Sequence, residues 1–320
     1  MIFIEADRVH ALLDYPSVVK AFEQYHKEGI DTLDELLMEQ PSPSGSPTHF
    51  FLRAAWKHQQ ALGVKLITVF PENETVATGL PSVQAVYVLF NGHNGQPEAC
   101  IDGTALTYRK TAADSALGTR FLARDDVQTM LMVGAGAMAP HLIQAHIAVR
   151  PSIARVFVWN RTASRARALV DSLHLKDIEI QATEDLPTIV QEADLISCAT
   201  MASTPLIKGQ WLKPGAHLDL VGGFTNAMRE ADDEAVRRAT VFVDMRATTI
   251  SHCGDISGPI EAGVITADDI RADFFDLCQG KYSGRKRPEE ITLFKNGGGG
   301  HLDLMTARFL LSRVQSLTVA

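Results

Sequence analysis

Three features are scarce in this sequence, and each scarcity excludes a class of protein. Cysteine occurs only four times in 320 residues, without a C-x-x-C pair, so the sequence predicts neither a disulfide framework nor a zinc site. No apolar run approaches the roughly 18 residues of a membrane-spanning helix. Basic side chains number 30 against 38 acidic ones. With no global positive field, we expect neither nucleic acid nor a membrane as a partner.

The remaining composition is that of a globular protein. Hydrophobic residues make up 46% of the chain and charged residues 21%, and this length suggests two domains. The N-terminal residues include acids where a secretory signal needs basic residues and an apolar core, so we expect a cytoplasmic location. One basic run, at 281–287, contains glycine and precedes Pro288; we expect a solvated loop there.

The N-terminal part combines helix and strand signals. Apolar positions recur at helical spacing over 6–28, with a break at 14–16. The turn-rich segment at 40–47 predicts a loop. β-type runs follow, and the last ends in the hairpin signal Asn91-Gly92. Several neighbouring strands joined by hairpins indicate a mainly antiparallel sheet. The runs are 50–56, 63–70 and 82–90.

After about residue 105 the pattern changes to alternating helices and strands. We expect helices at 107–123, 139–149, 164–172 and 302–314, the last after a glycine run at 297–300, and short strands at 130–133, 155–159, 178–181, 195–198, 217–221 and 241–243. Strands that alternate with helices predict a parallel, doubly wound α/β sheet.

The clearest local motif is G-x-G-x-x-A, which begins at Gly134 and follows a short apolar run. Gly134 would permit the tight turn, Gly136 the close approach of a pyrophosphate, and Ala139 close packing of the helix on the strand. The motif lies within a strand–turn–helix–strand unit of the right length. We therefore expect a dinucleotide to contact Gly134, Ala135, Gly136, Ala137 and Met138.

The end of the second strand indicates which dinucleotide binds. An NAD-binding enzyme usually has an acidic residue there to hold the ribose hydroxyls, but this chain has Asn160, Arg161, Thr162 and Arg165. These cations and hydrogen-bonding groups suit a 2′-phosphate. Both arginines could also be ordinary exposed residues at a helix start. We favour NADPH as cofactor, with weaker use of NADH.

With the dinucleotide unit in the middle, the segments GVKLITVFPEN (63–73), GLPSVQA (79–85), LTYRKTAA (106–113) and ITLFK (291–295) resemble the ornithine cyclodeaminase/mu-crystallin family. The resemblance covers nearly the whole chain. It implies a Rossmann domain at 119–299 and an α+β domain at 1–118 plus 300–320, which has a mainly antiparallel sheet, binds the substrate and forms a homodimer.

The resemblance leaves several reactions open, and Phe224 narrows them. It stands where the family's cyclodeaminases have a catalytic aspartate, and it can neither accept a proton nor hold an amine. The chain instead resembles the reductases of cyclic imines, which convert Δ1-pyrroline-2-carboxylate to L-proline, or the six-membered Δ1-piperideine-2-carboxylate to L-pipecolate. The alternatives are an alanine or N-alkyl amino-acid dehydrogenase, an ornithine cyclodeaminase and a non-enzymatic ligand binder like mu-crystallin.

Five further residues are candidates for binding and catalysis. Lys65, on an apolar strand, is the expected proton source, because burial would lower its pKa; a solvent-facing lysine is the alternative. Arg53, Lys65 and Lys110 are expected to bind the substrate, with Arg53 or Lys110 holding its carboxylate; a surface strand residue is the alternative for Arg53. Lys110 occupies the place of a family arginine and is also expected to contact the cofactor. Thr200 follows the 195–198 run, where a later Rossmann loop commonly touches the nicotinamide ribose, and Ser82 is expected as a further cofactor contact.

The remaining residues considered for the site are three histidines, one aspartate and one cysteine. His141 and His146 are five residues apart, off a shared helix face, so we expect no metal site. His301 and Asp303 follow the glycine run and are expected near the active site, although capping or packing explains Asp303 equally well. Cys198 is expected to be a small buried apolar residue.

Overall fold

The computed structural model describes residues 1–42, 47–74 and 79–319. Its contacts divide the chain into two units. Unit 1 comprises Met1–Lys110 and Gly299–Ala320, and unit 2 comprises Thr111–Gly298. The expected limits are 118 and 300, and the contacts divide the chain within one helix, α3 (Gly103–Leu122), and at Gly299.

Unit 1 contains a six-stranded sheet in the order β1-β6-β5-β4-β3-β2. Its strands pair antiparallel from β2 to β6, and only β1 joins in parallel, which confirms the mainly antiparallel prediction. The elements of unit 1 are β1 (Ile2–Ile4), α1 (Ala6–Leu12), α2 (Tyr15–Glu28), β2 (Thr32–Gln40), β3 (Thr48–Lys57), β4 (Ala61–Val69), the 3-10 turn η1 (Pro71–Glu74), β5 (Val83–Asn91), β6 (Pro97–Asp102) and α11 (Gly300–Val319).

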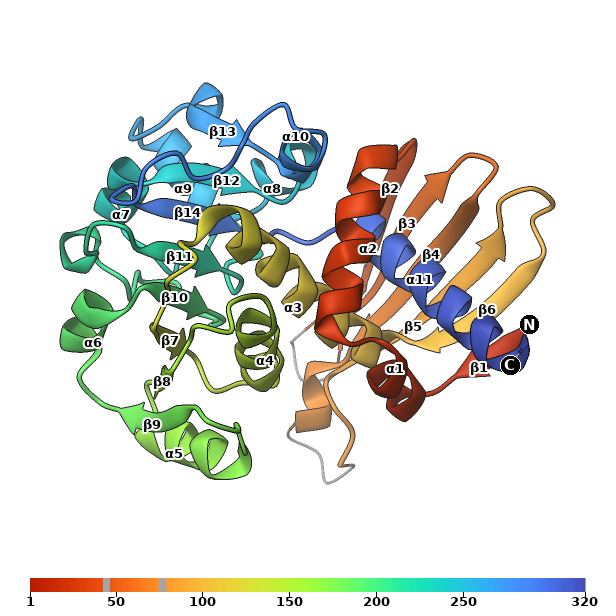
Figure 1. The fold of residues 1–320 in the computed structure, drawn as a ribbon. Coiled ribbons are helices and arrows are strands. Elements are labelled where there is room, and N and C mark those ends of the chain that lie inside the picture. Colours follow the sequence, from red (N-terminus) through yellow and green to blue (C-terminus); the bar gives the residue numbers. More distant parts are fainter. Residues whose placement is uncertain (43–46, 75–78, 320) are drawn as a thin grey trace. The chain divides into compact units, whose positions relative to one another are not determined.

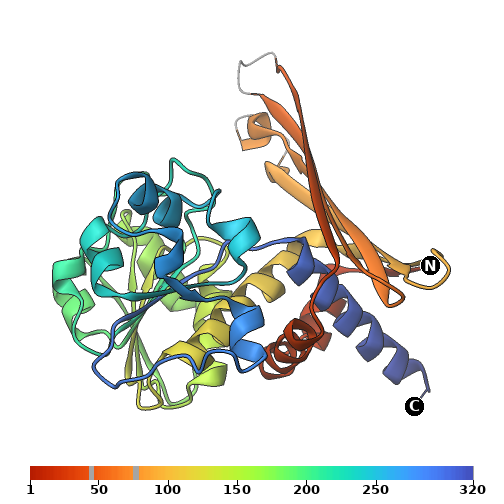
Figure 2. The ribbon, with the colours of Figure 1, turned by 90° about the horizontal axis from the view of Figure 1, so that it is seen from above.

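The two faces of this sheet have different surroundings. Directly paired residues share a face, and Arg53, Lys65 and Tyr87 are paired in register across β3, β4 and β5. Helix α11 contacts these three strands and also packs against α2, so it covers the face that carries Lys65 (Figures 1 and 2). The opposite face carries Trp56, which is 46% exposed.

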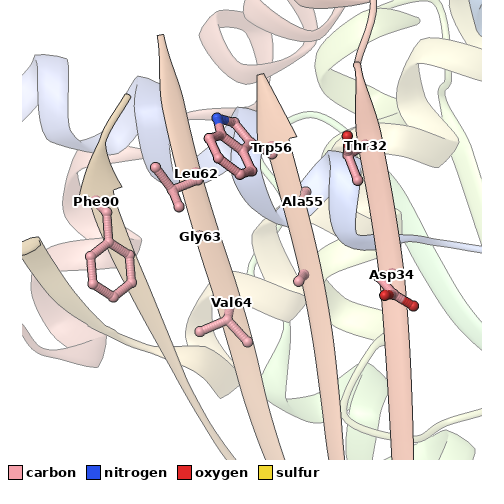
Figure 3. Close-up of a pocket in the computed structure, with 9 residues that line it drawn as sticks. Thr32, Asp34, Ala55, Trp56, Leu62, Gly63, Val64 and Phe90 are labelled. Atoms are coloured by element: carbon pink, nitrogen blue, oxygen red, sulfur yellow. The ribbon is translucent and has the colours of Figure 1, made fainter. Parts of the chain in front are cut away.

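The opposite face is apolar and lies open in the single chain. Trp56 pairs with Leu62, which in turn pairs with Phe90. Figure 3 shows these side chains around a shallow hollow that Thr32 and Asp34 border. Leu36, Met38 and Phe50 are 54%, 42% and 37% exposed. The sheet therefore buries one face beneath α11 and exposes the other.

Unit 2 contains an eight-stranded sheet in the order β13-β12-β14-β11-β10-β7-β8-β9. All neighbouring strands are parallel, and helices flank the sheet (Figures 1 and 2). This confirms the doubly wound α/β prediction. The elements are β7 (Thr129–Val133), α4 (Ala139–Val149), β8 (Arg155–Trp159), α5 (Ala163–Ser172), β9 (Glu179–Thr183), α6 (Leu186–Glu192), β10 (Leu195–Cys198), η2 (Gly209–Trp211), β11 (His217–Leu220), α7 (Asp233–Arg238), β12 (Thr240–Val243), α8 (Arg246–Thr249), α9 (Gly254–Glu261), η3 (Ala267–Asp269), β13 (Ile270–Ala272), α10 (Phe274–Cys278) and β14 (Thr292–Lys295).

The strand order of unit 2 indicates where a ligand binds. From β7 the chain continues outward through β8 and β9, and the strands that follow begin again at β10 on the other side of β7. The order therefore reverses between β7 and β10. In open parallel sheets, ligands bind beyond the carboxyl ends of the strands at such a reversal.

Two segments, 281–287 and 40–47, are predicted as loops. The basic run at 281–287 is not simply a solvated loop: the Arg285 guanidinium donates to the carbonyls of Leu122 and Ala216 at 2.6 and 3.1 Å and to Thr292 Oγ1 at 2.9 Å. These acceptors stabilise the half-buried guanidinium of Arg285. The sequence alone does not show that they lie near it. The loop predicted at 40–47 lies partly outside the described residues, at 43–46. Along the described chain, no helix has both the length and the apolar character needed to cross a membrane.

Candidate active site

The glycine turn lies at the carboxyl end of β7. Gly134 has φ +109°, which favours glycine, and its N–H donates to the Trp159 carbonyl at 2.8 Å. A Cβ at this position would lie 2.5 Å from the Ala199 oxygen. At Gly136, in contrast, nothing lies within 4 Å of the place a Cβ would take. The loop is packed tightly at its base and open at Gly136, just before helix α4 begins at Ala139, and this geometry fits a pyrophosphate.

The carboxyl end of β8 supplies the second part of this candidate dinucleotide site. Asn160 Oδ1 accepts from the N–H of Ala135 at 3.2 Å, and its amide nitrogen donates to the Thr162 carbonyl at 3.0 Å. Asn160 thus ties the glycine loop to β8. Arg161 and Arg165 are exposed, and within the described residues neither has a carboxylate partner. Two unneutralised guanidinium groups suit an anionic ligand group such as a 2′-phosphate.

Thr200 follows β10 at the same edge, but its polar groups are already engaged. Its N–H and its hydroxyl donate to Glu230 Oε1 at 2.7 and 2.8 Å. Glu230 Oε2 accepts from the N–H of Gly222 at 2.7 Å, just after β11. Sequence reasoning missed Glu230, because nothing near it in the chain shows which backbone groups it binds.

In unit 1, two buried lysines share one carboxylate. Lys65 on β4 and Lys110 on α3 are 4% and 3% exposed. Their Nζ atoms lie 3.4 and 3.3 Å from Oδ1 of Asp303 on α11. Lys65 also donates to Thr107 Oγ1, which in turn donates to the Gly103 carbonyl at 2.6 Å. Asp303 therefore interacts with two cations, rather than serving only to cap or pack its helix.

Burial and charge act in opposite directions on this cluster. Burial lowers the pKa of Lys65 to about 8, helped by the cations Lys110 and Arg53, while Asp303 opposes the shift. Burial also disfavours a charged Asp303, but Lys110 and Lys65 outweigh this and hold the pKa of the carboxyl below its ordinary value. The cluster thus combines two lysine side chains with one carboxylate. It carries a net positive charge that suits a carboxylate ligand.

Arg53 lies beside this cluster but has a partner of its own. It pairs in register with Lys65 on one side and with Glu35 on the other, and its Nε lies 2.6 Å from Glu35 Oε1. A substrate carboxylate would therefore compete with Glu35 for this guanidinium. The structure thus brings Lys65, Lys110 and Arg53 near one another in unit 1, together with Asp303, and adds Thr107 to the predicted set.

The other predicted residues lie in different surroundings. Ser82 precedes β5, where its carbonyl accepts from the Phe70 N–H at 2.8 Å. Phe224 is 57% exposed after β11, and Cys198 is fully buried as predicted. His301 is also fully buried, and its ring lies 5.8 Å from that of His26. In the described part of the chain, no group of three potential metal ligands occurs.

Comparison with known proteins decides the family. A profile of the ornithine cyclodeaminase/mu-crystallin family matches residues 14–317. The chain belongs to the ornithine cyclodeaminase/mu-crystallin family. This confirms the resemblance drawn from the glycine loop and the segments around it.

Three relatives lie near it within that family. Δ1-Pyrroline-2-carboxylate reductase of Paracoccus denitrificans is 45% identical over 267 residues, which are 83% of this chain and 84% of the relative. Protein SAR DEFICIENT 4 of Arabidopsis thaliana is 40% identical over 316 residues, 97% and 96% of the two chains. Thermococcus litoralis Δ1-pyrroline-2-carboxylate reductase, solved with NADH and L-proline, superposes with a TM-score of 0.89 at 28% identity. The match covers 99% of this chain and 98% of that chain.

Proposed function

We propose that this protein is an oxidoreductase that reduces Δ1-pyrroline-2-carboxylate to L-proline with a nicotinamide dinucleotide, and also accepts the six-membered Δ1-piperideine-2-carboxylate. The observation that carries the proposal is the buried pair Lys65 and Lys110 around Asp303, because its excess positive charge suits a substrate that bears a carboxylate next to a C=N bond. The relatives from Paracoccus and Thermococcus support the same reaction.

The proposed reaction adds a hydride to the imine carbon and a proton to the imine nitrogen. The nicotinamide supplies the hydride when bound. Lys110, together with Arg53, binds the substrate carboxylate and fixes the orientation of the ring. Lys65 Nζ gives its proton to the imine nitrogen and regains one from water. A pKa of about 8 suits this role, because Lys65 is charged at neutral pH and yet gives up its proton readily.

We propose NADPH as the preferred cofactor, with weaker use of NADH. Arg161 and Arg165 are exposed beyond β8 without carboxylate partners in the described chain, and no acid follows β8 to repel a 2′-phosphate. The Thermococcus relative was solved with NADH, so a direct comparison of the two cofactors is needed. Ser82, Lys110 and Thr200 are proposed as further cofactor contacts.

We also propose that two copies associate through the open face of the unit 1 sheet. Trp56, Leu36 and Met38 are exposed there to 46%, 54% and 42%, on the side of the sheet opposite to the one that α11 covers. Contiguous apolar surface of this kind typically marks an interface. A second copy would bury it by a self-complementary contact.

The test uses purified protein and preformed substrates. We expect Δ1-pyrroline-2-carboxylate to oxidise NADPH without added ammonia or amine and to yield L-proline. Turnover of pyruvate only with ammonia would instead indicate an amino-acid dehydrogenase, and release of ammonia from ornithine a cyclodeaminase. Binding of NADPH with no turnover of any imine would indicate a ligand binder. Each of these three results would overturn the proposed activity.

A further inference from the structure

The fully buried carboxylate of Glu230 joins two loops of unit 2 that follow β10 and β11, at the carboxyl ends of the parallel strands. Glu230 is 0% exposed. Its oxygens accept three hydrogen bonds, from the N–H and hydroxyl of Thr200 and from the N–H of Gly222, all within 2.8 Å. Thr200 follows β10 and Gly222 follows β11, so one side chain connects the ends of two neighbouring strands.

The first of these loops supports the glycine turn directly. The N–H of Ala199 donates to the Val133 carbonyl at 2.9 Å. A Cβ at Gly134 would lie 2.5 Å from the Ala199 oxygen and 3.2 Å from Thr200 Cγ2. The glycine turn therefore packs against Ala199 and Thr200, and Glu230 binds Thr200. This contact lies between β7 and β10, where the strand order reverses.

The second loop is packed equally closely. A Cβ at Gly222 would lie 1.9 Å from the Thr200 oxygen and 2.5 Å from Glu230 Oε1. The backbone after β11 thus touches both Thr200 and the carboxylate that binds it. The two loops are therefore in close contact around the Glu230 carboxylate.

Asp255 on α9 supports Glu230 from the interior. Asp255 Oδ1 accepts from the N–H groups of Glu230 and Ala231 at 2.7 and 3.3 Å, and Asp255 Oδ2 lies 3.3 Å from Lys295 Nζ. Asp255 and Lys295 are both fully buried. A chain of contacts therefore runs from Lys295 on β14 through Asp255 and Glu230 to the loops that follow β10 and β11.

We propose that Glu230 is a positioning residue for the dinucleotide, and that proton uptake by its carboxylate releases the Thr200 and Gly222 loops and weakens cofactor binding. The inference rests on the proposed function, because it takes the glycine turn as the dinucleotide site. All three groups that bond to the Glu230 carboxylate are hydrogen-bond donors, so protonation would replace three charge-assisted bonds by weaker neutral ones.

The titration of Glu230 falls in a testable range. Burial raises its pKa to about 7, while Lys295 opposes the shift and Asp255 adds to it. Lys295 and Cys198 are the other nearby groups with shifted pKa values. Burial works against the charge on Lys295, but Asp255 and Glu230 hold its pKa above the ordinary value. Burial keeps the pKa of the Cys198 thiol well above its usual value, so this thiol stays neutral.

The experiment measures the dissociation constant of NADH by its fluorescence for the wild type, Glu230→Gln and Glu290→Gln. NADH serves as the probe because it lacks the 2′-phosphate, which itself titrates near pH 6. Glu290 is the matched control. It also accepts three hydrogen bonds, from Thr240 Oγ1 and the N–H groups of Lys286 and Arg287 at 2.6, 2.7 and 3.3 Å. Glu290 precedes β14, however, and so lies at the amino ends of the parallel strands, away from the glycine turn at their carboxyl ends.

We expect NADH to bind the wild type about tenfold more weakly at about pH 6 than at about pH 8, because only the ionised fraction is competent to bind. At about pH 8, Glu230→Gln should weaken binding at least about tenfold and show no such pH dependence. Glu290→Gln should behave like the wild type. In turnover, Glu230→Gln should raise the KM for the cofactor more than it lowers kcat.

The outcomes separate this inference from the proposed function. If the wild type binds NADH equally well at both pH values, Glu230 does not act in this way, whether or not Glu230→Gln folds. Unchanged affinity in a folded Glu230→Gln protein leads to the same conclusion, and the proposed reduction then still stands. If the wild type binds neither NADH nor NADPH at any pH, both the proposed function and this inference are wrong.

Discussion

Replacing Asp303 by asparagine removes the only carboxylate that contacts both buried lysines, among the residues the structure describes. Lys65 Nζ lies 3.4 Å from Asp303 Oδ1. Two unit charges about 4 Å apart attract by about 4 kcal/mol at an effective dielectric constant of about 20, which corresponds to about three pKa units. Lys110 shares the carboxylate and the site can relax, so we expect a shift of at least about one unit.

The sign of the shift follows from the charges. Burial already lowers the pKa of Lys65 to about 8, and Asp303 is the group that opposes this shift. Without the carboxylate, the pKa of Lys65 should fall below about 7. If protonated Lys65 gives its proton to the imine, kcat/KM declines above the pKa of Lys65. The alkaline limb of the pH profile should then move to lower pH in Asp303→Asn.

The assay is the pH dependence of kcat/KM for Δ1-pyrroline-2-carboxylate in the wild type and Asp303→Asn. The substrate's own ionisation is identical in both proteins, so the difference between the two profiles belongs to the enzyme. Asp219→Asn is the matched control, since Asp219 is also fully buried but bonds to Ser197 and His146 in unit 2. If the alkaline limb of Asp303→Asn coincides with that of the wild type, Lys65 does not supply the proton.

Four further substitutions test separate parts of the account. Lys65→Ala should lower kcat at least about 100-fold and leave the dissociation constant of NADPH nearly unchanged; equal turnover would remove Lys65 from the mechanism. Arg161→Ala should weaken NADPH about tenfold and leave NADH unaffected, and an unchanged preference between the two cofactors would refute the 2′-phosphate assignment. Trp56→Glu should shift the protein towards monomers in sedimentation experiments, whereas an unaltered mass would rule out this face as the interface. Arg285→Met should lower the free energy of unfolding by about 3 kcal/mol in denaturant titrations, because several buried carbonyls lose their donor; a loss within about 0.5 kcal/mol would contradict that view of Arg285.

The elements around the glycine turn could be predicted from the sequence because their signals are local. Strand β7, helix α4 and strand β8 were expected at 130–133, 139–149 and 155–159, and the structure has them at Thr129–Val133, Ala139–Val149 and Arg155–Trp159. Each is an apolar run or a helical repeat bounded by glycine or polar residues. The parallel sheet follows from the alternation of such segments.

Strand β2 could not be predicted in the same way. Thr32–Gln40 lies at the edge of the sheet and is almost entirely exposed in the single chain. Its sequence, TLDELLMEQ, does not alternate strictly between apolar and polar residues, so a pattern search that looks for one buried face does not find it. The neighbouring strands β3, β4 and β5, whose inner faces are covered, were found.

The polar contacts of the site depend on chain segments far apart in sequence. Asp303 and Lys65 are separated by 238 residues, and Glu230 and Thr200 by 30. Sequence reasoning could place Lys65 on an apolar strand and Asp303 after a glycine run, but the fold is needed to pair them. Arg285 illustrates the same limit, because its burial depends on carbonyls that distant segments supply.

Transfer of deuterium shows whether a hydride passes from the nicotinamide to the imine carbon. Purified protein is given Δ1-pyrroline-2-carboxylate and NADPH that carries deuterium at the reactive position of the nicotinamide, without ammonia or any amine, and the proline formed is analysed by mass spectrometry and NMR. We expect the wild type to form L-proline with one deuterium at Cα, and Lys65→Ala to form almost none. Proline without deuterium, or no proline from a wild type that binds NADPH, would contradict it.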